Sequence, residues 1–307
     1  MTIGSHITTF AGKPVAEYPA DLGKASHAGT AWRLEDPDYD NTGQFLERLE
    51  ALAAQEWANQ VTALIVGNWG GAYDSAPPIE RLAALLPRFT RLRALFLGEM
   101  TYEECEISWI QQADITPLLE ALPLLEVLTV RGATGLGLKP LRHTALRSLT
   151  IESGGLPADV VRAVAECDLP ALTHLELWLG TENYGGDATV DDLAPILAGT
   201  RLPALTSLAL RDAEIADLVA VALAGAPVVA RLRELDLSLG MLSDEGAAAL
   251  LAGQPLTHLR KLDLHHHFIG APVLERLTAE LAASGVELDA SGADERDWDD
   301  RYIAVSE

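Results

Sequence analysis

The chain has 307 residues, 49% of them hydrophobic and 6% aromatic, with a formal net charge of −23 at pH 7. This balance excludes nucleic acids and anionic membranes as partners, because both are bound through Lys and Arg. There is no 18-residue apolar run to cross a membrane, and the two cysteines are too few for a disulfide framework. The start, MTIGSHITTFAGKPV, lacks the regions of a secretory signal, so we expect a cytoplasmic protein. The acidity either serves solubility alone or fits a basic partner.

Residues 1–59 are predicted to form a capping region. A hairpin is expected around Gly12-Lys13-Pro14, and a strand near AWRLE. The stretch TGQFLERLEALAAQEW (42–57) then places apolar side chains at helical spacing and predicts the first large helix. Its apolar residues are expected in the core: Phe45, Leu46, Leu49, Leu52 and Trp57.

A hexapeptide pattern, L-x-x-L-x-L, recurs from residue 61 onward. The copies are VTALIV (61), LRALFL (92), LEVLTV (125), LRSLTI (146), LTHLEL (172), LTSLAL (205), LRELDL (232) and LRKLDL (259), with a looser copy, ASGVEL, at 283. The fourth and sixth positions lie on the same side of an extended strand, so each copy predicts a strand with one buried face. Each unit is too small to bury that face alone, so neighbouring units must stack.

Helical patterns with start and stop signals separate these strands. TVDDLAPILAG places Thr189 as an N-cap and Gly199 just past the helix end, and SDEGAAALLAG does the same with Ser243 and Gly253. After the third copy, GATGLGLKPLRHT is too short for a helix, so a local irregularity is expected there.

A strand followed by a helix, as in LRELDLSLGMLSDEGAAALLAG, resembles the leucine-rich repeat in its long ribonuclease-inhibitor-like form. The resemblance implies an α/β fold: a right-handed solenoid, shaped as a horseshoe arc, with a parallel β-sheet on the concave face and helices on the convex face. The solenoid is expected over 60–290 and an acidic C-terminal cap over 291–307, all in one structural domain. EECEISWI, IESGGLP, LELWLGTENYGG and LDLHHH also resemble a bacterial intracellular leucine-rich-repeat family, which implies no known activity.

The ninth position of each repeat departs from that family pattern. Asn or Cys is usual there and satisfies backbone groups between coils. This chain instead has Trp69, Met100, Ala133, Gly154, Gly180, Ala213, Gly240 and His267. The usual ladder is therefore expected to be missing or replaced, and we expect His267 to form hydrogen bonds between coils.

The third, fifth and seventh positions of each repeat are predicted to point out of the concave sheet. In the first two repeats these positions are apolar or bare, for example Ile65 and Phe96. From the third repeat on they are charged, and we predict that they form the floor of a binding site: Arg131, Glu152, Glu176, Trp178, Arg211, Asp236, Asp263 and His265. Trp178 is expected to anchor a partner, with packing under the 180–190 loop as the alternative.

Two longer loops, 98–115 and 180–190, are predicted to border that site, because long loops on one face of a repeat array often bind. The first carries Glu104 and Trp109 within an acidic, aromatic cluster, and the second carries Tyr184. The alternative is a solvated charge run with Trp109 in the core. Cys105 lies among glutamates, which disfavours a thiolate.

Three consecutive histidines follow a strand in LDLHHH. Successive residues of a strand alternate faces, so His265, His266 and His267 are not expected to hold one ion together. A set of Asp236, Asp263 and His265 is a candidate for a divalent metal, although such residues usually serve as solvated contacts. We expect no metal and no cofactor.

No G-x-S-x-G, Walker A, H-E-x-x-H or C-x-x-C motif occurs. We therefore favour a non-enzymatic role. The expected function is a monomeric protein-interaction scaffold that binds another protein, with a basic surface, through the concave face and the two loops. The alternative is an enzyme or metal-dependent ligand binder with its site at the acidic concave patch or at loop 98–115.

Overall fold

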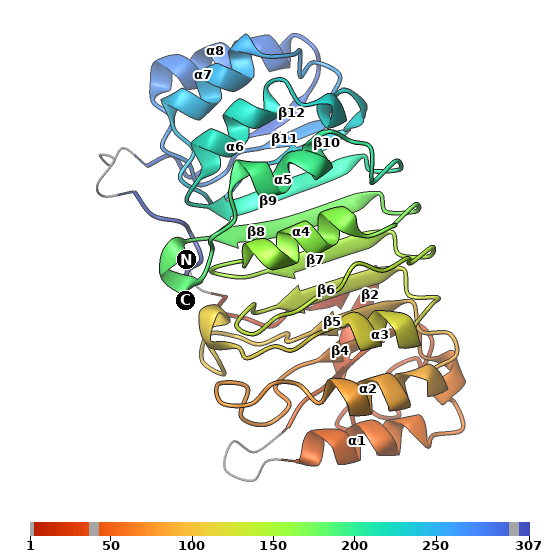
Figure 1. Ribbon diagram of the computed structural model, residues 1–307. Coiled ribbons are helices and arrows are strands. Elements are labelled where there is room, and N and C mark those ends of the chain that lie inside the picture. The colour runs from red at the N-terminus through yellow and green to blue at the C-terminus, as the bar shows by residue number, and fades with distance from the viewer. Residues whose placement is uncertain (1–2, 37–42, 295–300) are drawn as a thin grey trace. The chain divides into compact units, whose positions relative to one another are not determined.

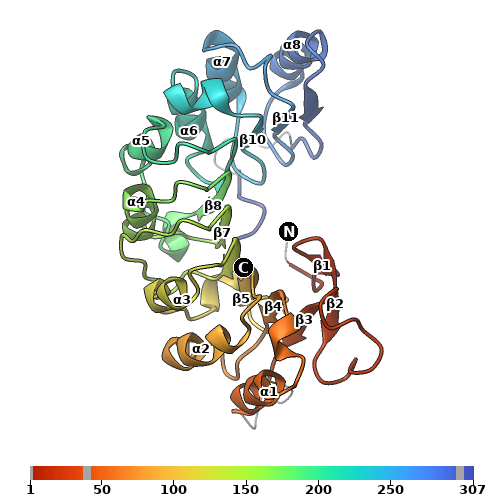
Figure 2. The same ribbon diagram turned by 90° about the vertical axis from the view of Figure 1, so that its right-hand side faces the viewer.

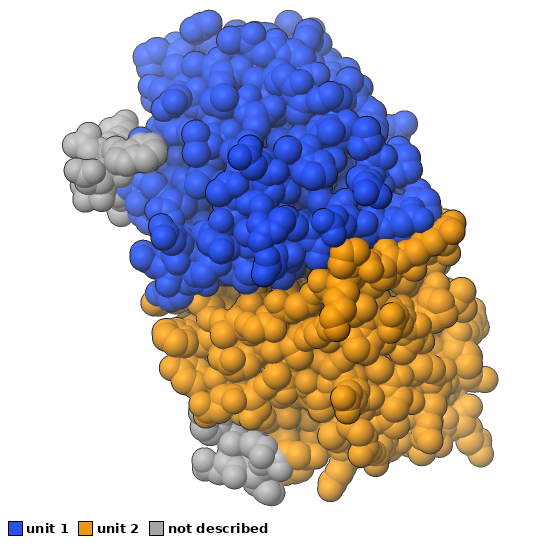
Figure 3. All heavy atoms as spheres, in the orientation of Figure 1, with its two compact units in different colours: residues 1, 153–306 blue, residues 2–152, 307 orange. Residues whose placement is uncertain are grey.

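The computed structural model describes residues 3–36, 43–294 and 301–307. The chain forms two compact units, residues 2–152 (the N-terminal unit) and 153–306 (the C-terminal unit), coloured separately in Figure 3. Over the described residues it is a mixed α/β fold with twelve strands and eight α-helices (Figure 1). Residues 295–300 of the predicted acidic cap lie outside the described residues. The predicted division into two caps and a solenoid within one domain remains a prediction.

The N-terminal unit contains seven strands that follow chain order in the sheet. They are β1 (Thr9–Phe10), β2 (Lys13–Glu17), β3 (Ala31–Leu34), β4 (Ala63–Val66), β5 (Ala94–Leu97), β6 (Val127–Arg131) and β7 (Ser148–Glu152). The pair β1 and β2 is antiparallel and forms the predicted hairpin, whereas all later pairs up to β7 are parallel. The strand predicted near AWRLE is β3.

Helices cover one face of this sheet. They are α1 (Gln44–Ala53), α2 (Ile79–Leu85) and α3 (Thr116–Ala121) (Figure 2). The unit also contains the 3-10 helices η1 (Ala58–Gln60), η2 (Leu86–Arg88) and η3 (Ile107–Trp109). On the opposite face, Phe10 packs against Ile65 and Phe96. Ile65 and Phe96 of the first two repeats are thus covered by Phe10 of the hairpin, because apolar side chains on an outward face of a sheet need a cover.

The C-terminal unit contains five parallel strands in chain order. They are β8 (His174–Gly180), β9 (Ser207–Ala213), β10 (Glu234–Asp236), β11 (Lys261–Asp263) and β12 (Glu287–Asp289). Its helices are α4 (Ala158–Glu166), α5 (Val190–Leu197), α6 (Ala216–Leu223), α7 (Asp244–Ala252), α8 (Ala271–Ala282), η4 (Glu182–Tyr184) and η5 (Pro227–Arg231). Figure 2 shows these α-helices on one face of the strands. We call the other face of β8–β12 the open face.

The leucines of the repeated hexapeptide form the core beneath the helices. Leu175 and Leu177 of β8 are fully buried, and Leu208, Leu235 and Leu262 are paired in register across β9, β10 and β11. Residues between them lie on the open face, so the predicted alternation is confirmed in this unit. A strand corresponds to each of the nine predicted copies.

The predicted helix signals are confirmed with one correction. Thr189 forms a capping box with Asp192 at the start of α5, and the Ser243 side chain caps α7. The described residues between β6 and β7 contain no helix, as the short third repeat predicted. The prediction that the first helix reaches residue 57 is wrong, because α1 ends at Ala53 and Trp57 instead packs against the Trp32 ring.

His267 links neighbouring repeats as predicted. Its side chain is fully buried; Nε2 donates to the Ala290 carbonyl at 3.0 Å, and Nδ1 accepts the Ile269 N–H at 3.0 Å. Burial lowers the pKa of this imidazole. A neutral histidine thus satisfies backbone groups at the ninth position of this repeat.

Within the described ranges, none of the helices has both the length and the apolar character needed to cross a bilayer.

Candidate binding surface

The register of β8–β12 aligns open-face residues into rows across the C-terminal unit. One row pairs Glu234 with Lys261 and Lys261 with Glu287, and the next pairs Asp236 with Asp263 and Asp263 with Asp289. We call this surface the acidic face. It comprises His174, Glu176, Trp178, Arg211, Glu234, Asp236, Lys261, Asp263, His265, Glu287 and Asp289. This set contains six carboxylates and two permanent cations, Arg211 and Lys261, and Arg260 beside it pairs with Glu234 at 3.2 Å.

Arg211 is the central cation of the acidic face. Its Nη1 donates to Glu176 Oε1 at 2.7 Å, and its Nε donates to Ser238 Oγ at 2.9 Å and lies 3.4 Å from Asp236 Oδ2. The guanidinium carbon lies 5.2 Å from the centroid of the Trp178 ring, within the range of a cation–π contact. These contacts fix Arg211 within the sheet, so its charge serves mainly to hold the surrounding carboxylates.

Trp178 does not present the large exposed area that the sequence predicted. The residue is only 7% exposed, and its Nε1 donates to Glu176 Oε1 at 2.7 Å. The expectation of an exposed aromatic anchor was wrong, because Arg211 of the next repeat lies over the ring. Direct contact between Trp178 and a partner stays an untested prediction.

Glu176 is held in its ionised form. Burial opposes ionisation, but the hydrogen bond from His174, the charge of Arg211 and the hydrogen bond from Trp178 outweigh it and lower the pKa of Glu176 to about 2. A depressed pKa means that this carboxylate contributes stability above its unfolded pKa, and that the contribution is lost as pH falls toward 2.

We expect carbon-13 NMR of the Glu176 carboxyl group to show a titration midpoint far below the usual range of a glutamate carboxyl group. Replacing Arg211 with Met should raise the Glu176 midpoint, because the main opposite charge is removed. An unshifted Glu176 midpoint in the R211M protein would contradict this assignment.

The three histidines contact different partners. His265 Nδ1 lies 2.6 Å from Asp263 Oδ1, His266 Nε2 donates to the Tyr302 carbonyl at 3.1 Å, and His267 binds Ala290 as described above. This agrees with the expectation that they do not share one ion.

The described residues do bring a three-donor set together on the acidic face, but it differs from the predicted one. Asp263, His265 and Asp289 each offer a ligand atom, and these atoms lie within 4.8 Å of one another. Asp289, from the looser ninth copy, takes the place predicted for Asp236. Burial opposes ionisation of Asp263, but hydrogen bonds from Lys261 and His265 outweigh it and lower the pKa of Asp263. Lys261 Nζ already occupies Asp263 Oδ2 at 2.9 Å.

Arg131 and Glu152, also predicted for the binding floor, belong to the N-terminal unit. Arg131 is 4% exposed; its Nε donates to Glu152 Oε2 at 2.6 Å and its Nη1 donates to the Met100 carbonyl at 2.6 Å. Its guanidinium also lies 5.1 Å from the Phe96 ring centroid. Arg131 is therefore a packed residue that ties β6 to its neighbours.

The loop 98–115 surrounds a buried ion cluster that the sequence did not predict. Arg33 of β3 and Glu99 are both fully buried and form an ion pair, and Glu104 of the same loop lies 3.5 Å from Arg33 Nη2. His6 Nε2 lies 3.4 Å from Glu104 Oε2. Cys105 is buried, and burial, followed by the charges of Glu106 and Glu104, raises the pKa of its thiol to about 11.

Trp109 of this loop is 41% exposed and stacks on Tyr73, with ring centroids 5.5 Å apart. The alternative that placed Trp109 in the core is therefore wrong. A role for this aromatic pair in binding stays a prediction.

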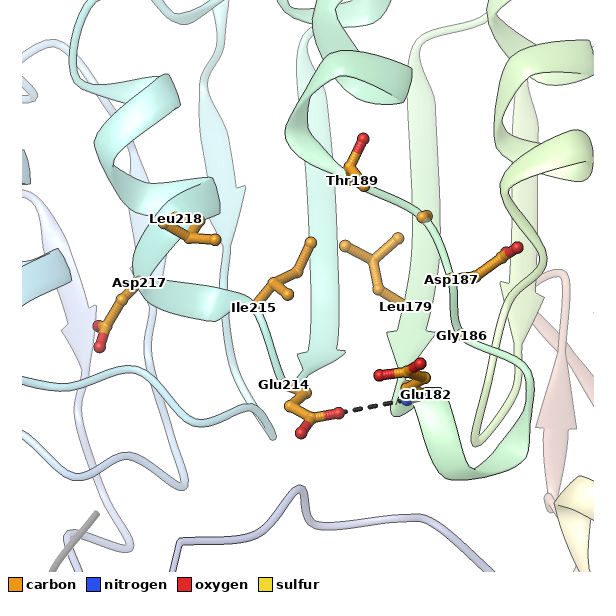
Figure 4. Close-up of a pocket in the computed structure, with 11 residues that line it drawn as sticks. Leu179, Glu182, Gly186, Asp187, Thr189, Glu214, Ile215, Asp217 and Leu218 are labelled. Atoms are coloured by element: carbon orange, nitrogen blue, oxygen red, sulfur yellow. Dashed lines mark hydrogen bonds between the residues drawn. The ribbon is translucent and has the colours of Figure 1, made fainter. Parts of the chain in front are cut away.

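The loop 180–190 borders a cavity of about 500 Å³ at the carboxyl ends of β8 and β9 (Figure 4). Leu179, Ile215 and Leu218 form its apolar wall, and Glu214 Oε2 accepts the Glu182 N–H at 3.2 Å. Tyr184 ends η4 and is half-buried, and its side chain does not line this cavity.

No protein-family model and no curated protein matches the chain. A solved structure does: the crystal structure of a Bacteroides fragilis protein is similar with a TM-score of 0.78 and 28% sequence identity. The match covers 89% of this chain and 76% of the other chain. It supports the mixed α/β repeat architecture.

Proposed function

We propose that the chain is a monomeric cytoplasmic protein-binding module whose acidic face recognises a partner segment rich in Lys and Arg. Its strand–helix units are, in this proposal, leucine-rich repeats of the ribonuclease-inhibitor-like form. The observation that carries the proposal is the alignment of six carboxylates against two cations on one face of a parallel sheet.

The rigidity of the acidic face supports recognition. Asp236 accepts the Ser238 N–H at 2.9 Å, and Asp289 accepts the Ser291 hydroxyl at 2.7 Å, so these carboxylates are oriented before a partner arrives. Little side-chain entropy is then lost on binding. Glu287 is exposed and Glu234 is half-buried, so both remain accessible to cations.

We expect the double variant Glu234→Gln/Glu287→Gln to weaken binding of a fluorescent ten-residue lysine–serine peptide at least tenfold. Raising the salt from 50 to 500 mM should weaken binding to the unsubstituted protein, because exposed charges are screened. The measurement is fluorescence polarisation.

The matched control is Glu275→Gln/Glu280→Gln, which removes two exposed carboxylates from α8 of the same unit and the same net charge. Equal weakening by both double variants would mean that net charge alone attracts the peptide, and the proposal would fail.

A second candidate function, metal-dependent ligand binding, is favoured by Asp263, His265 and Asp289. A cation there would have to displace Lys261 from Asp263. Elemental analysis of untagged protein tests it: a stoichiometric metal that His265→Ala removes would support this candidate, and a metal-free protein would exclude it.

A further inference from the structure

Three non-glycine residues of the C-terminal unit adopt left-handed backbone at a regular spacing. Asp212, Leu239 and His266 have φ angles of 50°, 68° and 56°, and they lie 27 residues apart, each near the carboxyl end of its strand β9, β10 or β11. Residues with a Cβ atom rarely adopt this conformation; Asp and His do so more often than most, whereas leucine is unusual there. Such residues cluster at sites where the strain serves binding or switching.

We call Asp212, Leu239 and His266 the corner residues. A hydrogen bond to the next repeat holds each corner residue in place. Asp212 donates its N–H to Ser238 O at 2.9 Å, and Leu239 donates to His265 O at 2.9 Å. His266 donates to Ser291 O at 2.8 Å. The three corners therefore form a fixed row across the ends of three strands.

The segment Arg301–Val305 lies along this row and forms a hydrogen bond with each of the three residues. The Val305 N–H donates to Asp212 Oδ1 at 2.9 Å, the Ala304 N–H donates to Leu239 O at 2.7 Å, and His266 Nε2 donates to Tyr302 O at 3.1 Å. The segment has no helix or strand of its own. Its main-chain N–H and C=O groups make these hydrogen bonds, as those of a bound extended peptide would.

Side chains of the segment fill matching positions. Ile303 is 4% exposed and packs between Met241 and Phe268. The Tyr302 ring meets His266 edge to face, with centroids 5.2 Å apart. Arg301 Nη1 lies 3.4 Å from Met241 O and 3.5 Å from Asp217 Oδ2. The row thus offers an apolar pocket for Ile303, an aromatic contact for Tyr302 and a carboxylate that pairs with Arg301.

The Asp212 side chain is incompletely satisfied even with the segment bound. It is fully buried, and its Oδ2 has no hydrogen-bond partner among the described residues. Burial raises the pKa of this carboxyl group well above its usual value. A buried polar oxygen without a hydrogen-bond partner disfavours the state in which the segment is bound, which is expected where a segment must leave as well as bind.

We propose that the row Asp212–Leu239–His266 is a peptide-binding groove that the chain's own 301–305 segment occupies exchangeably. Its ligand is an extended peptide of five residues. In order, these are an arginine, an aromatic residue, a β-branched aliphatic residue, a small residue and a second aliphatic residue. The groove adjoins the acidic face but shares no residue with it, so it is a second recognition site beyond the proposed function.

The test uses a fluorescent peptide with the sequence of residues 301–306, RYIAVS, added to the full chain. Ile303→Asp, which weakens the intrachain segment, should bind the peptide at least tenfold more tightly than the unsubstituted chain. Val221→Asp, the same charge placed at an exposed position of α6, should bind like the unsubstituted chain. A peptide with Asp in place of its Ile should not bind. If Ile303→Asp folds but binds no better than the unsubstituted chain, the proposal is wrong.

Hydrogen exchange of the unsubstituted chain keeps the proposal testable if Ile303→Asp does not fold. The Ala304 and Val305 amides should exchange at least tenfold faster than the Leu208 and Leu235 amides, through local release of the segment. Equal rates would show that the segment opens only with the whole unit and would overturn the proposal.

Discussion

Replacing Arg33 with Met is expected to lower the free energy of unfolding by about 3–5 kcal/mol, because it removes one partner of a buried ion pair. Arg33 is 1% exposed and Glu99 is 0% exposed. Arg33 Nη2 also donates to Glu35 Oε2 at 2.6 Å. Without the guanidinium these carboxylates face one another, and Arg131, 4.0 Å from Glu99 Oε1, is the nearest permanent cation left among the described residues.

The double variant Arg33→Met/Glu99→Leu separates charge from packing. It removes both buried charges, so we expect it to recover at least half of the stability lost in the single variant. Urea denaturation with a common m-value is the measurement. Glu99 also accepts a hydrogen bond from the Ile7 N–H and contacts His6 Nδ1. A double variant less stable than Arg33→Met would show that Glu99 contributes to stability through these two residues rather than through Arg33.

Leu235→Ala is expected to cost about 2–5 kcal/mol, the range for truncating a buried leucine. Leu235 is 1% exposed and pairs in register with Leu208 and Leu262, so its loss leaves a cavity inside a leucine layer. The matched control is Leu218→Ala on α6, where the leucine is 56% exposed and the change should cost less than about 0.5 kcal/mol. Comparable losses in thermal or denaturant melts would contradict the observed register.

The strands could be predicted because the pattern that specifies each one lies within six consecutive residues. In LTHLEL, two leucines two residues apart fix which side of the strand is buried, and no distant residue can change that assignment without inverting every side chain. The same argument placed Glu176, Asp236 and Asp263 on the open face. The helix caps Thr189 and Ser243 were equally local, since a cap needs only the N–H groups of the next turn.

What the sequence did not predict depends on contacts between distant residues. Arg33 and Glu99 are 66 positions apart, and nothing in AWRL identifies the partner of its arginine. The burial of Trp178 depends on Arg211 in the next repeat. One signal was available: Ile65 and Phe96 are apolar at strand positions predicted to point out of the sheet, which requires a cover such as Phe10.

The hydrogen bonds from the 301–305 segment to Asp212, Leu239 and His266 affect the order in which the C-terminal unit folds. Val305 and Asp212 are 93 residues apart, whereas the paired Glu234 and Lys261 are 27 apart. Closing the longer loop costs about 1 kcal/mol more in chain entropy. The full set of hydrogen bonds that offsets this cost forms only when Asp212, Leu239 and His266 are all in place. The sheet of the C-terminal unit can therefore grow one repeat at a time through short closures, and the segment docks only after β9, β10 and β11 are in place. Docking is then a late step in folding and an early step in unfolding.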